Sequence, residues 1–209
     1  MEGWYAGNVE DGDLTRPTVS EVHEALRTHR VLLSHFISDT PMDSGWGPSP
    51  LYPDSLLRVL NRQCPGGICC STFCAADEPR GGVNVAGSVG VLLRPASDRS
   101  VLAAAPHDIG SVYKDGVRWF RRPPKAVSKD DLSNSIEQRA ADQWNEWIVD
   151  DYVPIGLIIL ERNGFSVGTE KCQGLAEDFG YPVYQIHDGR LVRLHGDRWI
   201  PADQADLYP

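Results

Sequence analysis

The sequence lacks several features that would assign it at once to a functional class. Its longest strongly apolar run, residues 153–160, contains a proline and is far shorter than the roughly 20 residues of a membrane-spanning helix. No lysine or arginine precedes Arg16, so the first residues do not have the form of a secretory signal. With 20 Lys+Arg against 29 Asp+Glu, the net charge of −9 argues against a protein built mainly to grip phosphate backbones. We therefore expect a cytoplasmic globular protein that has no membrane partner.

Familiar catalytic motifs are also missing, and the cysteines are unevenly distributed. The sequence contains no P-loop, no dinucleotide-binding GxGxxG, no HExxH and no GxSxG. Four of its five cysteines, Cys64, Cys69, Cys70 and Cys74, lie close together, but no second pair of ligands follows, as a zinc site would require. The run 68–74 is typical of a buried strand in which cysteines act as small hydrophobic residues. We expect reduced thiols and no metal.

The patterns that are present predict one α+β domain over residues 18–209, preceded by a flexible arm over residues 1–17. Helices are expected at 18–30, with Ser20 as N-cap, at 54–60, at 129–143, where Ser128 and Asp131 resemble a capping box, and at 171–179. Period-two apolar runs and two Asp-Gly turns, at 115–116 and 188–189, predict hairpins. We expect a mostly antiparallel β core of two packed sheets with a few helices. The acidic last residues are expected to be loose.

Glu146 is the most interesting carboxylate, because it lies between Trp144 and Trp147. Two indoles beside a carboxylate make a partly dry setting, which raises the reactivity of the charge. The pattern of residues 144–149 fits either a continuing helix or a strand. On a helix, Glu146 would be a solvated residue of the polar flank. Among the histidines, His35 inside an apolar strand and His107 at a strand end are the candidates for chemistry, although a histidine in a strand is more often structural.

Three short motifs together resemble the ADP-ribosyltransferase fold, most nearly the DarT-type nucleic-acid ADP-ribosyltransferases and related phage-resistance proteins. The first is Leu33-Ser34-His35-Phe36-Ile37-Ser38, which is similar to the family's strand with His-Phe-x-Thr/Ser. The second is Cys70-Ser71-Thr72-Phe73, at the place of the family's second strand. The third is Asn145-Glu146-Trp147-Ile148-Val149, similar to the apolar strand that begins with the family's catalytic glutamate. The family's arginine after the second strand has no counterpart, because Phe73 is followed by Cys74-Ala75-Ala76.

This resemblance implies an ADP-ribosyltransferase or NAD-glycohydrolase, an enzyme of the glycosyltransferase class that takes NAD as its substrate. Cleavage of the nicotinamide–ribose bond passes through an oxocarbenium-like centre, which the carboxylate of Glu146 would stabilise. The resemblance assigns NAD binding to His35, Phe36, Ser71, Phe73 and Trp119, with His35 and Ser71 on ribose hydroxyls and Phe73 or Trp119 on nicotinamide. The acceptor would be a nucleic acid or a protein, in the setting of a toxin or of phage defence.

Two other classes of function stay open at this point. A cysteine-dependent hydrolase or deamidase would use Cys69, Cys70 or Cys74 with His35 or His107. A non-enzymatic binding module, such as an antitoxin, an inhibitor or a degenerate transferase, fits the net charge of −9 if its partner is basic. The basic run of Arg118, Arg121, Arg122 and Lys125 beside Trp119 and Phe120 indicates either a site for a phosphate or a single-stranded base, or a solvated hairpin edge.

Overall fold

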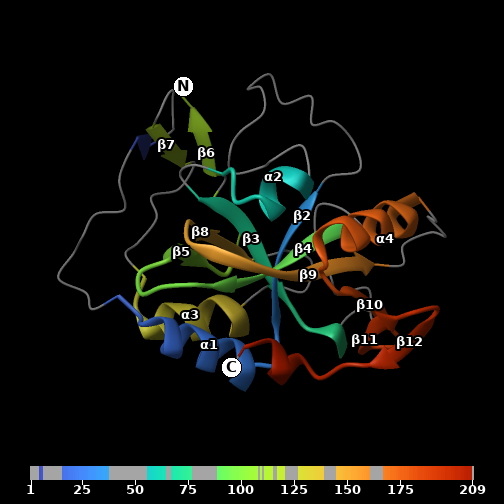
Figure 1. Cartoon of the computed structure of the whole chain (residues 1–209). Coiled ribbons are helices and arrows are strands. Elements are labelled where there is room, and N and C mark those ends of the chain that lie inside the picture. Colours follow the sequence, from blue (N-terminus) through green and yellow to red (C-terminus); the bar gives the residue numbers. More distant parts are fainter. Residues whose placement is uncertain are drawn as a thin grey trace.

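The computed structural model describes residues 5–6, 16–37, 56–64, 67–76, 89–107, 109, 111–114, 117–120, 127–138, 145–160 and 167–208. These residues form an α+β fold whose centre is a large sheet with helices on both of its sides (Figure 1). The expected turn at 115–116, the basic residues at 121–125 and most of the expected N-terminal arm lie outside the described residues.

The helices follow from local signals. They are α1 (Val19–Thr28), α2 (Leu56–Leu60), α3 (Lys129–Glu137), α4 (Val167–Phe179) and the 3-10 helix η2 (Gln204–Leu207). A capping box starts α1, but its N-cap is Thr18 rather than the Ser20 that we predicted, because the Thr18 side chain and Glu21 satisfy each other's backbone N–H groups. The capping box of Ser128 and Asp131 at the start of α3 is confirmed.

Twelve strands form two separate sheets among the described residues. The smaller sheet has the order β1-β7-β6 and contains β1 (Tyr5–Ala6), β6 (Ser111–Lys114) and β7 (Val117–Phe120). The larger sheet has the order β12-β11-β10-β9-β4-β2-β3-β8-β5. Its strands are β2 (Leu32–Ile37), β3 (Ile68–Phe73), β4 (Val89–Pro95), β5 (Val101–Ala105), β8 (Glu146–Val149), β9 (Tyr152–Leu160), β10 (Val183–His187), β11 (Arg190–His195) and β12 (Arg198–Pro201).

The mostly antiparallel character of the sheet is confirmed, since among the described strands only β9 and β10, joined by α4, run parallel. The two packed sheets that we predicted are not confirmed. The nine strands are continuous because β3 pairs with β2 through its second half and with β8 through its first half, and so joins what would otherwise be two sheets. In Figure 1, α1 and α3 lie on one side of this sheet, and α2 and α4 lie on the other. The hairpin predicted around Asp188 is confirmed, with positive φ at both turn residues.

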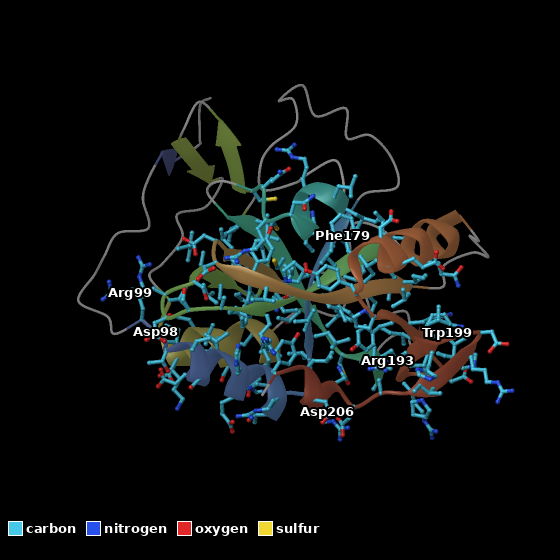
Figure 2. The ribbon with its side chains drawn as sticks, in the orientation of Figure 1. Asp98, Arg99, Phe179, Arg193, Trp199 and Asp206 are labelled. Carbon is cyan, nitrogen blue, oxygen red and sulfur yellow. The ribbon has the colours of Figure 1, made fainter. Side chains whose placement is uncertain are left out.

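The C-terminal residues differ from our expectation of a loose tail. β12 extends the sheet beyond β11, and Figure 2 shows Trp199 on this outer hairpin, with Asp206 on the segment that follows. Tyr208 is fully buried, and its hydroxyl oxygen accepts a hydrogen bond of 2.7 Å from the backbone N–H of Leu33 on β2. Gln204 donates its side-chain N–H to the carbonyl oxygen of Arg30 at 3.0 Å. The prediction of a loose tail was wrong because it considered the acidic residues and overlooked Tyr208, whose aromatic ring is buried in the core.

Candidate functional site

β2 and β3 separate at a fork that lies beside His35 and Cys69. The two strands pair only from Leu32↔Phe73 to Ser34↔Ser71. Beyond this point β2 continues along β4, with His35 opposite Val91, while the earlier residues of β3 pair with β8, with Cys69 opposite Ile148. A backbone group that faces a fork has no ladder partner on that side, so another group has to satisfy it.

His35 supplies such a partner at the fork. Its Nδ1 atom lies 2.6 Å from the carbonyl oxygen of Cys69. Because a carbonyl oxygen only accepts hydrogen bonds, Nδ1 carries the proton and donates it. Burial lowers the pKa of His35 to about 4, against the opposing effect of this hydrogen bond, so the ring is neutral at physiological pH.

The second ring nitrogen of His35 is then an acceptor. The side chain is 2 % exposed, and Nε2 has no hydrogen-bond partner among the described residues. Buried acceptors in native proteins nearly always have a donor, from the chain, from water or from a ligand. At the fork, Nε2 of His35 is therefore a buried acceptor that a donor from another part of the chain, from water or from a ligand would satisfy.

Glu146 is the first residue of β8 and is fully buried. Its Oε2 atom accepts a hydrogen bond of 2.6 Å from the backbone N–H of Ile109, and its Oε1 atom accepts one of 3.2 Å from the thiol of Cys69. Residues 146–149 form a strand and do not continue the preceding helix, which decides between the two predicted alternatives. The interpretation of Glu146 as a solvated residue on a helix flank is wrong, because β3 and β5 enclose β8 on both edges.

Cys69 is the point at which these residues meet. Its carbonyl oxygen binds His35 and its thiol binds Glu146, although the three residues come from three different strands. Ser71 lies two positions further along β3, on the same face as Cys69, and is half-buried. The structure therefore brings His35 and Glu146 to the same residue, Cys69, whereas Ser71 only shares a face of the sheet with Cys69 and Glu146.

The aromatic residues that were assigned to NAD are placed differently. Phe73 is fully buried, and its ring packs edge-on against Phe36 with the ring centroids 5.4 Å apart. This pair forms part of the core beside the fork. Trp119 belongs to β7, where it is paired with Ala6 and Val112 in the smaller sheet, and not to the strands that carry His35 and Glu146. The binding roles of these three aromatic residues stay predictions.

The geometry disfavours a cysteine nucleophile. Cys64, Cys69, Cys70 and Cys74 are free thiols, and burial raises the pKa of Cys64 and that of Cys70, which opposes formation of the reactive thiolate. The Cys69 thiol donates to a carboxylate, whereas His35 binds the backbone of this residue. In the described part of the chain, no three His, Cys, Asp or Glu side chains gather in a group that could hold a metal ion.

Sequence reasoning missed a second polar cluster, on the opposite face of β8. Asn145, which directly precedes Glu146, accepts a hydrogen bond of 2.8 Å from the backbone N–H of Thr72. Its amide nitrogen donates to the Thr72 hydroxyl at 2.5 Å and to the Ser135 carbonyl oxygen at 3.1 Å. The indole N–H of Trp147 donates to the Ser135 hydroxyl at 2.8 Å. The only sequence signal was a polar residue at the head of an apolar strand, which is too common to single out Asn145.

Comparison with protein-family models, with curated proteins and with solved structures finds no match to this chain. None of the helices in the described ranges has the length and apolar character that a membrane crossing requires. The basis for a function is therefore the arrangement of the residues around Cys69.

Proposed function

We propose that the protein cleaves the nicotinamide–ribose bond of NAD and transfers the ADP-ribose to an acceptor, with Glu146 as the catalytic carboxylate. The observation that carries this proposal is the meeting of His35 and Glu146 at Cys69, from motifs that lie far apart in the sequence. An ADP-ribosyltransferase-like arrangement of the α+β fold is part of the proposal. It is supported by the adjacency of β2, β3 and β8, the three strands that carry the three motifs.

The surroundings of Glu146 suit the stabilisation of a developing positive charge. A carboxylate in a dry site interacts with an oxocarbenium-like centre far more strongly than one in water. Its two oxygens are held in place by a backbone N–H and a thiol, so the carboxylate does not have to reorient when the charge develops. Both of these donors are neutral groups.

The neutral ring of His35 suits the recognition of ribose. Its Nε2 acceptor would take a hydrogen bond from a ribose hydroxyl, while Nδ1 stays bound to Cys69. Ser71, half-buried on the neighbouring strand, offers a hydroxyl that can donate or accept. In this proposal the acceptor of ADP-ribose is a nucleic acid or a protein, and water takes its place if the enzyme is a glycohydrolase.

A second candidate function is a non-enzymatic relative that acts as a binding module. It is favoured by the burial of Glu146, since a carboxylate that binds a backbone N–H and a thiol inside the protein also meets the requirements of a purely structural role. In that case Glu146 would tie the backbone of Ile109 to Cys69 of β3. Turnover of NAD separates the two candidates.

The test compares nicotinamide release from NAD by the wild type and by Glu146→Gln, with NAD binding followed by calorimetry. The variant keeps the size of the side chain and removes its charge. We expect a loss of about a hundredfold in rate, equivalent to roughly 3 kcal/mol, with binding preserved. Glu177→Gln, on the exposed face of α4, is the matched control and keeps full activity. A wild type that neither binds nor cleaves NAD would end the proposal and favour the binding module.

The acceptor is identified in the same assay with NAD labelled in its adenylate part. Single-stranded DNA, RNA and a cell protein extract are offered separately, and covalent label is measured on each. Label on one of them names the acceptor class, while release of nicotinamide with only free ADP-ribose as product indicates a glycohydrolase.

A further inference from the structure

We infer that Asn145 is a positioning residue for Glu146, and that it acts together with Thr72 and Ser135 on the face of β8 away from the carboxylate. The geometry alone supports the positioning; its importance for catalysis rests on the proposed function.

Asn145 lies where the strand ladder between β3 and β8 ends. The pairing of β3 with β8 runs from Ile68↔Val149 to Cys70↔Trp147. Continued by two positions, it would place Thr72 opposite Asn145. At that position the Thr72 N–H binds the side-chain oxygen of Asn145. The side-chain amide of Asn145 thus extends the hydrogen bonding between β3 and β8 past the position of Glu146.

The residues on either side of Glu146 lie on the opposite face of β8. Successive residues of a strand point to opposite sides, so Trp147 points away from Glu146 and Ile148. The indole N–H of Trp147 is bound by Ser135 of α3, and Asn145 binds the carbonyl oxygen of the same serine. The two residues that flank Glu146 in sequence are therefore both anchored to α3.

The polar side-chain groups of Asn145, Trp147 and Ser135 all have hydrogen-bond partners. Asn145, Trp147 and Ser135 are all fully buried. The amide of Asn145 uses both of its N–H groups and its oxygen, and the Ser135 hydroxyl accepts from Trp147 while it donates to Leu132 at 2.7 Å. A buried network of this kind is rigid, because any movement leaves a buried polar group without its partner. The head of β8, and with it the carboxylate, is held to one position.

The position of Glu146 has a reporter that does not depend on NAD, namely the Cys69 thiol that the carboxylate binds. If the cluster positions Glu146, its loss frees this thiol. We expect Asn145→Ala to raise the alkylation rate of Cys69 by iodoacetamide, measured site by site with mass spectrometry, about tenfold. Thr72→Val, which removes only the hydroxyl, has a smaller effect in the same direction and serves if Asn145→Ala does not fold. Thr72→Ser restores the wild-type rate.

The matched control is Ile68→Val, a small loss of packing on the same strand away from the cluster. A Cys69 labelling rate that rises no more in the cluster variants than in Ile68→Val overturns the inference, since general loosening then explains it. This readout also holds if the wild type does not cleave NAD, an outcome that removes the proposed function alone.

If the wild type does cleave NAD, the cluster variants lower kcat at least tenfold and leave KM unchanged, because the substrate contacts stay intact while the carboxylate shifts. The contrary result is that Thr72→Val and Ile68→Val have equal kcat while Glu146→Gln still loses about a hundredfold in rate. That result would overturn the role of the cluster in catalysis and leave the proposed function standing.

Discussion

Removal of the Tyr208 hydroxyl tests how the C-terminal residues hold the strand that carries His35. Tyr208 and Leu33 are both fully buried, and the 2.7 Å bond between them is the partner of the Leu33 N–H. Tyr208→Phe keeps the ring and leaves this N–H without an acceptor in a place that bulk water does not reach. An unsatisfied buried donor costs about 2 kcal/mol. For a chain of this size that loss corresponds to a fall in Tm of roughly 4–8 °C.

The assay is denaturant unfolding combined with hydrogen exchange at the Leu33 amide, which should lose protection in the variant. Tyr208→Ala also empties the space of the ring and should cost about 3–5 kcal/mol. Tyr181→Phe is the control, because its half-buried hydroxyl has no hydrogen bond among the described residues and its loss should cost less than about 0.5 kcal/mol. If Tyr208→Phe leaves the unfolding midpoint and the Leu33 exchange rate unchanged, the anchoring argument is refuted.

The remaining predictions concern the fork. The pKa of His35 is about 4 in the folded protein and near 6.5 in the unfolded chain, so the unfolded chain binds more protons between these values and stability falls as the pH drops through this window. Between pH 7.5 and pH 5 the wild type should lose roughly 2 kcal/mol more than His35→Asn, measured by urea unfolding at each pH; parallel losses would contradict this. Gly90→Ala would place its new methyl carbon 2.7 Å from the Ser34 hydroxyl oxygen and 2.8 Å from the His35 carbonyl oxygen, which should cost about 1–3 kcal/mol. Gly174→Ala in α4 meets nothing within 4 Å and should instead stabilise by about 0.5–1 kcal/mol, so the sign of the change in Tm separates the two.

Local patterns were sufficient for most elements of this fold. The capping box at Ser128, the continuous apolar run of β9 and the Asp-Gly turn at Asp188 each depend on neighbours in sequence, and the structure contains all three. Residues 144–149 could not be assigned from local patterns, because so short a run of apolar and polar residues fits both the period of a helix and the period of a strand. The pairing of β8 with β3 and with β5 decides that choice, and both partners lie far away in the chain.

The candidate site was predictable only in its outline. The motifs around His35 and Glu146 predicted that these residues converge, and the two residues do meet at Cys69. The acceptor state of the His35 Nε2 atom depends on a carbonyl group of another strand, which no residue type in the sequence reveals. The role of Asn145 likewise depends on a helix and a strand that pack around it.

β8 lies between β3 and β5, although both of these strands precede it in the chain. A chain during its synthesis therefore cannot complete the sheet in the order of its residues. The place for β8 has to stay open until residues 146–149 arrive, and such non-local pairings close slowly. Glu146 is carried into position by this late insertion, so a partly folded chain has the fork without its carboxylate. Under the proposed function, the pairing of β8 with β3 and β5 is therefore the folding step that completes the site.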